Sequence, residues 1–354
     1  MRKAGTSSTP TIEEVAGLAG VSVSSARNYF SRPEVLSAET RTRIKDAVQE
    51  TGYFPRGSVG GLGRRQLGRI GFEVPRAEDS AVNVIFNELL LNLLWAARSA
   101  AFRLHPFVTD KEPGSRAPYY EQLWEQREVG GFILTDIVYD DDRVAYLQRA
   151  QVPFVLVGRL RYETGYCWVD NDNVAGSVMA VEHLVEQGHQ RIAYLGWPPS
   201  DAVADRRLEG YRLGLATAGK LPECIELQSY GQPAVEQAHN LLRRSPRPTA
   251  VVTSCDEFAY DVIRAAAAIG LEVGGSPDQI AIVGCDDSAM TSRTVPALTS
   301  LHQPVQRLAE RATDLLIARM ANPRLEAHAL ERPQLIVRES SRHMSNVAPA
   351  TAAT

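Results

Sequence analysis

Residues 11–30 read TIEEVAGLAGVSVSSARNYF, and this stretch decides the fold of the amino-terminal part of the chain. Thr11 and Glu14 have the spacing of a capping box, in which each side chain bonds to the backbone N–H of the other residue. A helix is therefore predicted to begin at Ile12. Gly20 is predicted to end this helix, because a residue without Cβ turns the chain at little steric cost.

Two further helices follow in the same region. Ser22 is the predicted cap of a second helix over residues 23–30, joined to the first by a tight turn that contains glycine. This arrangement is the pattern of a helix-turn-helix. Ser37 begins a third predicted helix, which ends at Gly52. Its apolar residues recur at helical spacing and are Ile44, Ala47 and Val48.

The second helix has a polar side, formed by Ser24, Ser25, Arg27 and Asn28. Its apolar side is predicted to pack on the first and third helices and consists of Val21, Ala26 and Phe30. Small hydroxyls, an amide and a guanidinium at one end of a helix suit the base edges in a DNA major groove. The pattern therefore predicts a DNA-binding domain.

The composition indicates an ordinary globular protein. At 354 residues the chain is long enough for two or three domains. No run approaches the roughly 20 apolar residues of a membrane span, and no apolar stretch follows the basic amino terminus. The cysteines, Cys167, Cys224, Cys255 and Cys285, lack C-x-x-C spacing, which argues against a zinc site or a disulfide framework. We expect a cytoplasmic protein without a metal or other cofactor.

Charge is unevenly distributed along the chain. The formal net charge is −4, yet residues 1–65 contain ten basic and six acidic side chains, so the remainder carries a net −8. A basic small domain attached to an acidic larger one fits phosphate contact at one end of the protein. Ordinary scatter of solvated charges is the alternative explanation.

From residue 67 onwards, predicted strands alternate with predicted helices. The strands are residues 68–75, 104–108, 130–134, 152–157, 191–195, 250–254, 279–284 and 334–339. The helices are residues 84–102, 119–126, 144–149, 175–187, 205–218, 260–269 and 305–320. Such alternation predicts two parallel sheets covered by helices, with ligands bound at the carboxyl ends of the strands in a cleft between two α/β halves.

Several segments resemble one protein family. Residues 11–16, 19–22, 35–41 and 52–55 resemble the headpiece of the lactose-repressor (LacI/GalR) family of bacterial transcription regulators. The ligand-binding core of that family, which shares its architecture with periplasmic sugar-binding proteins, is matched by residues 169–173, 182–184, 188–192, 207–211, 282–287 and 296–304. The resemblance implies an α/β fold with a three-helix helix-turn-helix headpiece. It also implies a periplasmic-binding-protein-like core of two doubly wound parallel-sheet subdomains.

The resemblance also implies a domain order. It consists of a disordered arm (1–10), a DNA-binding headpiece (11–55), a hinge (56–66), an effector-binding and dimerisation core (67–340) and a disordered tail (341–354). In the family the hinge becomes a helix on operator DNA. Four glycines among residues 57–63 would each cost such a helix about 1 kcal/mol relative to alanine. We therefore expect this hinge helix to form less readily than in relatives.

The resemblance assigns DNA-binding residues one by one. Base-reading positions are Val23, Ser24 and Asn28, where Asn28 suits adenine and Val23 a thymine methyl. Leu62 matches the leucine that wedges into the minor groove at the centre of the operator. Phosphate contacts, which add affinity without specificity, are assigned to Thr11, Ser22, Ser25, Arg27 and Tyr53.

Effector-binding residues follow from the same resemblance. Arg207 is the first of them, because its fixed fork matches a carboxylate or neighbouring hydroxyls, and a surface ion pair along its helix is the alternative. Asp286 is expected to accept hydrogen bonds from effector hydroxyls, unless it caps the following turn as Asp287 is expected to do. The other candidates are Phe86, which core packing explains nearly as well, Arg159, Cys255 and Asp256.

No enzyme motif is present. The sequence lacks G-x-S-x-G, H-E-x-x-H, G-x-G-x-x-G and a P-loop, and His189 belongs to a helix-ending Gly-His in the family. We therefore predict a sequence-specific transcription regulator, a repressor, which binds double-stranded operator DNA as a homodimer and is controlled by a small molecule, a sugar or sugar derivative. The alternatives are a periplasmic-type sugar-binding protein without DNA function, and a regulator that answers to a corepressor or a protein partner.

Overall fold

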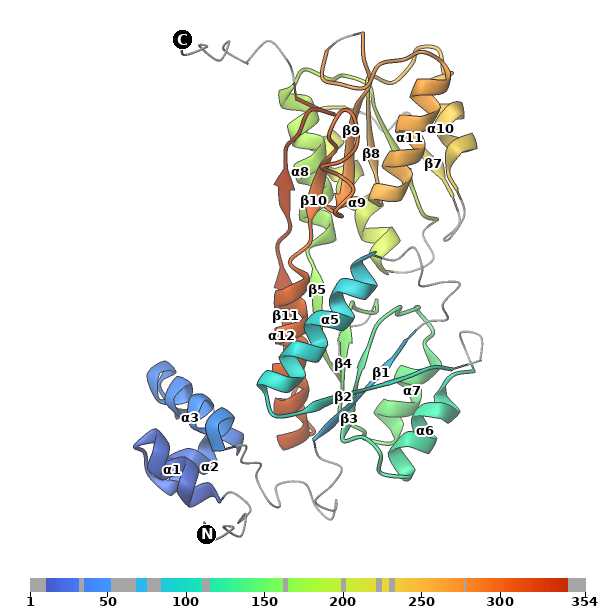
Figure 1. Cartoon of the computed structure of the whole chain (residues 1–354). Coiled ribbons are helices and arrows are strands. Elements are labelled where there is room, and N and C mark those ends of the chain that lie inside the picture. Colours follow the sequence, from blue (N-terminus) through green and yellow to red (C-terminus); the bar gives the residue numbers. More distant parts are fainter. Residues whose placement is uncertain are drawn as a thin grey trace, which may run out of the picture. The chain divides into compact units, whose positions relative to one another are not determined.

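The computed structural model describes residues 11–31, 35–51, 68–74, 84–109, 115–161, 165–198, 202–220, 225–228, 233–276 and 278–342 (Figure 1). Tyr53, the hinge over residues 56–66 with Leu62, the arm and most of the tail lie outside these residues. The predictions made for them therefore stay predictions. In the described part of the chain, no helix is long and apolar enough to cross a membrane.

The headpiece consists of the three predicted helices, α1 (Ile12–Ala19), α2 (Val23–Ser31) and α3 (Ala38–Thr51). The capping box is present, because the Thr11 N–H donates to the Glu14 carboxylate at 2.7 Å and the Glu14 N–H donates to the Thr11 hydroxyl at 3.2 Å. Gly20 ends α1 with a φ of 61°, as its lack of a Cβ allows. These local signals confirm the predicted start and end of the first helix.

The apolar sides of the three helices form one small core. Val15, Ala26 and Ile44 are fully buried at its centre, one from each helix. Arg43 of α3 adds a polar clamp, because its guanidinium donates to the Ala19 carbonyl at 2.7 and 2.9 Å. This contact satisfies a carbonyl that the end of α1 leaves without a helical partner.

The rest of the chain contains two six-stranded sheets. The first has the order β11-β5-β4-β3-β1-β2 and the second β12-β10-β9-β8-β6-β7. Strands of the first are β1 (Arg69–Glu73), β2 (Arg103–Phe107), β3 (Gly131–Leu134), β4 (Phe154–Val157), β5 (Cys167–Asn171) and β11 (His328–Glu331). Strands of the second are β6 (Ile192–Gly196), β7 (Ile225–Leu227), β8 (Ala250–Thr253), β9 (Ala281–Asp286), β10 (Thr299–His302) and β12 (Gln334–Ile336).

The inner strands of both sheets pair in parallel, and β12 runs antiparallel to β10. The helices between the strands are α5 (Val84–Ser99), α6 (Ala117–Glu125), α7 (Asp142–Arg149), α8 (Asn173–Glu186), α9 (Ala202–Thr217), α10 (Val235–Leu242), α11 (Asp256–Ala268) and α12 (Val305–Ala321). The predicted α/β class with two parallel sheets is confirmed.

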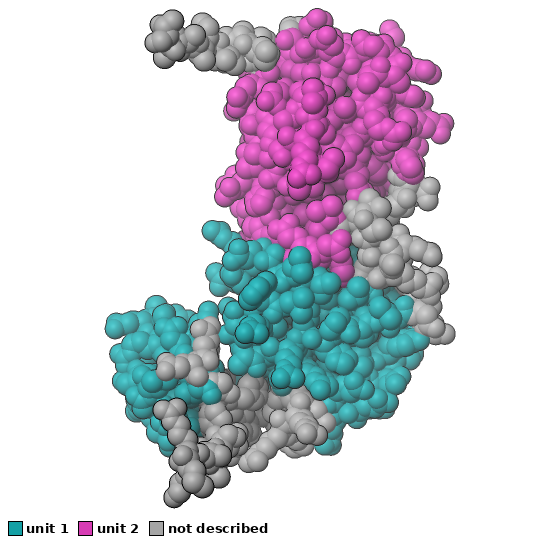
Figure 2. Space-filling view, viewed as in Figure 1, with its two compact units in different colours: residues 1–76, 89–169, 306–329 teal, residues 77–88, 170–305, 330–354 magenta. Residues whose placement is uncertain are grey.

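The chain divides into two compact units (Figure 2). Unit 1 comprises residues 1–76, 89–169 and 306–329, and unit 2 comprises residues 77–88, 170–305 and 330–354. From β5 onwards, the chain passes from one unit to the other at residues 169/170, 305/306 and 329/330. We call the residues beside these three points the crossover segments.

Five elements were not predicted, namely β5, β7, β10, β11 and α10. Three of them carry few apolar residues or lie partly exposed, as in β7, β11 and the sequence Thr-Ser-Leu-His of β10. α11 begins at Asp256 and not at residue 260, because the acidic residues of its first turn complement the helix dipole. Ser341, assigned to the tail, is fully buried, so the core extends at least one residue past the predicted limit of 340.

Candidate DNA interface and ligand site

α2 presents the polar side that its sequence predicted. Ser24 and Arg27 are exposed, whereas Ser25 and Asn28 are partly covered. Arg27 lies 3.9 Å from Glu13 of α1, with both side chains more than 60% exposed, which makes this ion pair a weak one. Val23 packs partly against the headpiece core, so it offers less surface to a base than Ser24 does.

Two predicted phosphate contacts, Ser22 and Thr11, also cap helices, and a third, Ser25, bonds to one of them. Ser22 accepts a hydrogen bond from the Ser25 N–H at 3.0 Å, and the two hydroxyls lie 2.9 Å apart. Thr11 accepts from Glu14 as described above. Each hydroxyl therefore has a structural role at a helix amino terminus, where backbone N–H groups also favour phosphate.

Glu73, at the end of β1, is the centre of a buried polar cluster in unit 1. Its carboxylate accepts hydrogen bonds from Thr109 at 2.7 Å, from Tyr120 at 2.8 Å and from Arg143 at 2.8 Å. Arg116 lies 3.5 Å from the same carboxylate. Burial acts to raise the pKa of Glu73, but Arg143 and the hydrogen bonds outweigh burial, and the pKa lies below its usual range. The carboxylate is therefore charged and paired.

Arg143 completes this cluster and is only 1% exposed. It donates to both oxygens of Asp141, at 2.9 and 2.6 Å, and to the carbonyls of Thr135 and Asp136, at 2.9 and 3.0 Å. These bonds fix the loop after β3. The cluster was not predicted, because an acid at a strand end and an arginine 70 residues later give no sign in the sequence that they meet.

Two predicted effector residues, Arg159 and Phe86, have other neighbours. Arg159, just after β4 in unit 1, lies over the ring of Trp168 at 4.9 Å from its centre, a cation–π contact. Trp168 in turn stacks on His328, with ring centres 4.8 Å apart. Phe86 of α5 is only 4% exposed, which favours the core-packing alternative.

Arg207 is held at the carboxyl edge of the second sheet by close packing of α8 and α9. A Cβ on Gly210 would lie 2.4 Å from the Val174 carbonyl oxygen, and one on Gly214 would lie 2.8 Å from Val181. Only glycine at these two positions lets α9 approach α8 so closely. The Arg-x-x-Gly spacing therefore brings Arg207 against the start of α8.

The guanidinium of Arg207 is buried, with 6% of the residue exposed. Its Nε donates to the Asn173 side-chain oxygen at 3.0 Å, and Nη1 donates to the Ser254 carbonyl. Nη2 lies 4.0 Å from Asp286, and the guanidinium carbon lies 5.5 Å from the centre of the Trp197 ring. Arg207 thus belongs to the interior of unit 2 and not to the outer surface of α9.

Asp286 ends β9 beside Arg207. Its φ is 123°, a conformation that residues with a side chain rarely adopt and that is typical of functional sites. Gln303 donates a hydrogen bond to its carboxylate. Burial, together with Asp256, raises the pKa of Asp286 against the opposing effect of Arg207. This carboxylate is therefore costly to keep charged without a further donor.

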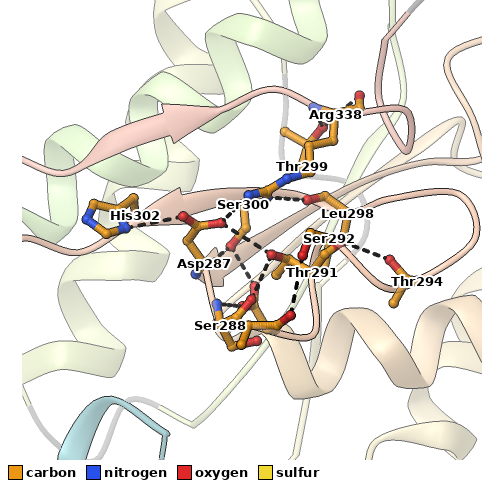
Figure 3. A network of polar contacts seen from close by, with 12 residues as sticks. Asp287, Ser288, Thr291, Ser292, Thr294, Leu298, Thr299, Ser300, His302 and Arg338 are labelled. Carbon is orange, nitrogen blue, oxygen red and sulfur yellow. Dashed lines mark hydrogen bonds and ion pairs between the residues drawn. The ribbon is translucent and has the colours of Figure 1, made fainter. Parts of the chain in front are cut away.

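Asp287 fixes the turn that follows, as expected, through a polar network (Figure 3). Its carboxylate accepts from Arg338 at 2.7 Å and from Thr291 at 3.3 Å, and lies 3.2 Å from the His302 ring nitrogen. Its N–H donates to the Ser300 hydroxyl at 3.0 Å. The network holds the turn after β9 and so presents Asp286 at the strand end.

Asp256 and Cys255 are engaged in structure. Asp256 accepts from the Ser300 hydroxyl at 2.6 Å and from the Ser288 N–H at 2.8 Å, one bond to each oxygen. Burial raises the pKa of the Cys255 thiol well above its usual value. These contacts favour capping and packing for the pair. His189 likewise lies buried, with its ring 3.1 Å from the Thr249 hydroxyl.

A small cavity of about 10 Å³ lies beside Arg207, with room for roughly one water molecule. Its polar lining comes from Asn171, Asn173, Ser177, Thr253 and Gln303. The buried side-chain oxygen of Asn171 has no hydrogen-bond partner among the described residues. Gln303 was not predicted as a site residue, although it lies within the segment 296–304 that resembles the family.

Two family models match the chain. Bacterial regulatory proteins of the lacI family match residues 11–56, and the periplasmic binding protein-like domain matches residues 181–341. The ribose operon repressor of Escherichia coli (strain K12) is 27% identical, over 94% of this chain and 99% of its own length. The HTH-type transcriptional regulator CelR of Thermobifida fusca is 30% identical, over 94% of this chain and 98% of its own length.

Solved structures agree with these matches. A regulatory protein of the LacI family from Chloroflexus aggregans is 34% identical, with a TM-score of 0.71 over 78% of this chain and 99% of that one. A complex of the transcriptional regulator CelR with cellobiose is 27% identical, with a TM-score of 0.71 over 94% of this chain and 99% of that one.

A helix-turn-helix headpiece joined to a two-sheet α/β core defines a class of proteins, the ligand-regulated DNA-binding regulators. Within this class the chain belongs to the LacI family of bacterial regulatory proteins. Its relatives are transcriptional regulators, and no enzyme family is indicated.

Proposed function

We propose that this protein is a repressor whose headpiece (11–55) binds a pseudo-palindromic operator, and whose core (67–340) binds a sugar or sugar derivative. The ligand changes operator affinity because it binds two states of the protein unequally. The observation that carries the proposal is the Arg207–Asp286 pair at the carboxyl edge of the second sheet. A protein that acts on chromosomal DNA in this way works in the cytoplasm.

The chemistry beside Arg207 favours a neutral ligand rich in hydroxyls. Asp286 offers acceptor oxygens to hydroxyl groups, while the charge of Arg207 already faces Asp286. Asp256 and Glu257 add negative charge that acts on Asp286. An anionic ligand would meet this field unfavourably, whereas hydroxyl donors would stabilise the carboxylate. The ribose named for one relative and the cellobiose bound by another support a sugar.

Dimerisation is proposed through the exposed side of α5. Leu91 and Trp95 are 60% and 68% exposed and lie one helical turn apart, with Val84 and Leu94 also exposed on the same helix. Apolar side chains grouped in this way on a surface mark a contact with another protein. A second copy is the natural partner, because a palindromic operator presents two identical half-sites.

The proposed DNA contacts divide into two groups. Ser24 and Asn28, with Val23 at a thymine methyl, would read base edges, and Leu62 would wedge into the minor groove. Phosphate contacts are proposed for Thr11, Ser22, Ser25, Arg27 and Tyr53. The exposure of Ser24 and Arg27 and the capping geometry of Thr11 and Ser22 support these assignments.

Operator selection from random duplex DNA tests the proposal. The full chain is incubated with the pool in the presence and absence of neutral sugars, cellobiose and ribose among them, and of sugar phosphates. We expect a palindromic consensus whose recovery changes with a neutral sugar. Response to a sugar phosphate alone would contradict the proposed ligand chemistry.

Variants of the recognition helix separate base readers from phosphate contacts. Asn28→Ala is expected to cost about 1–3 kcal/mol at one half-site position and to relax preference there, and Arg27→Ala to weaken all sequences alike. If both lower affinity uniformly, the assigned recognition side is wrong.

Two alternatives predict different outcomes. A sugar-binding protein without DNA function would enrich no sequence under any condition, although the family match over residues 11–56 speaks against it. A regulator that answers to a corepressor would enrich its operator only when the ligand is present.

A further inference from the structure

We propose that Gln303 is a positioning residue that orients the Asp286 carboxylate and links its state to two of the crossover segments. This inference rests on the proposed function, because Asp286 is taken there as the acceptor for ligand hydroxyls. Gln303 is 5% exposed and follows β10 directly.

One side-chain amide joins two distant segments. The Gln303 Nε2 donates to the Asp286 carboxylate, and its Oε1 accepts from the Asn171 Nδ2. Asn171 and Gln303 each lie within three residues of a crossover, at 169/170 and at 305/306. The three side chains therefore form a chain of hydrogen bonds from the ligand-facing strand end to both crossover segments.

The acceptor oxygen of Asp286 fixes the direction of this chain of hydrogen bonds. A carboxylate only accepts hydrogen bonds, so Gln303 must turn its NH₂ group toward Asp286 and its oxygen toward Asn171. Asn171 must then turn its own NH₂ group toward Gln303. Both amides are thus oriented by the acceptor oxygen of one side chain.

This orientation has a cost at Asn171. Its side-chain oxygen is left beside the small cavity without a hydrogen-bond partner among the described residues. A buried acceptor without a donor destabilises the arrangement. A ligand hydroxyl that donates to Asp286 competes with Gln303 for the same carboxyl group. The hydrogen bond from Gln303 then becomes less important, and the two amides are no longer held in the unfavourable orientation.

The contacts around these three side chains support a role in coupling and not only in packing. Arg207 approaches Asp286 from α9, and its Nε donates to Asn173, two residues beyond Asn171. The Asn173 Nδ2 donates to the Asn171 carbonyl at 3.1 Å. The ring Asn171–Gln303–Asp286–Arg207–Asn173 closes on itself, so a change in bonding at one member reaches the others.

Hydrogen exchange of the full chain tests the link without any ligand. Asp286→Asn replaces one carboxyl oxygen, which can accept from Gln303, with a donor NH₂ group, and it should speed amide exchange around residues 169–173 and 303–306 by about threefold to tenfold. In a Gln303→Leu background, the same change at Asp286 should have no further effect there. Unchanged exchange at residues 169–173, or an equal response without Gln303, would overturn the proposal.

A second measurement separates positioning from simple stability. With the selected operator and cellobiose or ribose as the probe, Gln303→Leu should keep operator binding in the absence of ligand within about threefold. The ligand-induced change in operator affinity should fall at least about tenfold. Gln122→Leu is the matched control, because Gln122 is exposed on α6 and is remote in sequence from the crossover segments. If the ligand changes the operator affinity of Gln303→Leu as much as that of the wild type, the proposal is overturned.

The two experiments fail in different ways. If the wild-type protein answers to none of the sugars, the proposed function fails, while hydrogen exchange still decides whether Gln303 links Asp286 to the crossover segments. If the protein answers to a sugar but exchange and coupling do not depend on Gln303, the link alone fails.

Discussion

The two sheets have the same strand order, yet they treat the charges at their carboxyl ends in opposite ways. In unit 1, Glu73 and Arg143 bond directly at 2.8 Å, and further neighbours complete the bonding of both side chains. In unit 2, Arg207 and Asp286 lie 4.0 Å apart, and burial raises the pKa of Asp286. The carboxyl ends of the strands therefore carry a directly bonded pair in unit 1, at β1, and a more widely spaced pair in unit 2, at β9, where we propose that the ligand binds.

The largest expected effect tests the closed cluster of unit 1. Arg143→Leu leaves Glu73 and Asp141 buried without their main partner, and it should destabilise the protein by about 3–5 kcal/mol. Urea unfolding followed by circular dichroism measures the loss. Arg149→Leu, at the exposed end of the same helix, is the control and should change the midpoint little. Equal unfolding midpoints for the two variants would contradict the stabilising role of the cluster.

The counterpart in unit 2 should lose ligand response before stability. Arg207→Ala removes a charged donor from the ligand site and should weaken ligand binding by about 1.5–3 kcal/mol, about 10- to 100-fold. Operator binding without ligand should stay within about twofold. Titration of the operator complex with the responsive sugar checks both values. A retained response would exclude Arg207 from the site.

Neutralising one carboxylate in each unit should change the stability of the protein in opposite directions. Glu73 has a lowered pKa, so Glu73→Gln removes a favourable charge and should cost about 1–3 kcal/mol at pH 8. Asp286 has a raised pKa, so Asp286→Asn relieves a buried charge and should leave the ligand-free protein as stable or more stable. Thermal unfolding of both variants without ligand decides this. A change of stability in the same direction for both variants would contradict the proposed difference between the two units.

The smallest effect concerns pH. Burial, with Asp256 and Asp261, raises the pKa of Glu257 to about 7. A raised carboxyl pKa favours the folded state below the ordinary value of about 4.3, and this contribution is lost as the pH rises through about 7. Glu257→Gln should therefore unfold at a slightly higher temperature than the wild type at pH 8 and at a similar one at pH 4. A gap that grows toward pH 4 would contradict this assignment.

Local signals made the headpiece readable from its sequence. Thr11 with Glu14, Gly20 and Ser22 each act on neighbours within four residues, so their effects are encoded in consecutive positions. Alternation of strands and helices likewise predicted the α/β class. Edge strands such as β7 and β11 were not predicted, because a strand that is covered on one side only contains few apolar residues.

The sequence predicted part of the grouping of the side chains assigned to the ligand site. Arg207 and Asp286 do lie together, whereas Phe86 and Cys255 are buried in ways that favour packing. Gln303 and Arg143 had no distinguishing signal, because an amide or a guanidinium looks the same in a sequence whether it meets solvent or a carboxylate. Glu73, the partner of Arg143, and Asp286 and Asn171, the partners of Gln303, lie 17 to 132 residues away along the chain.

The sequence by itself determined the helix-turn-helix, the α/β alternation and the family. These depend on capping, periodicity and motifs, which act over a few residues. Only the tertiary structure decided which strand-end charges bond directly to each other and which lie farther apart, and that the Gln303 amide bonds to Asp286. The physical reason is that burial and hydrogen bonding depend on neighbours in space, and folding brings these together from distant parts of the chain.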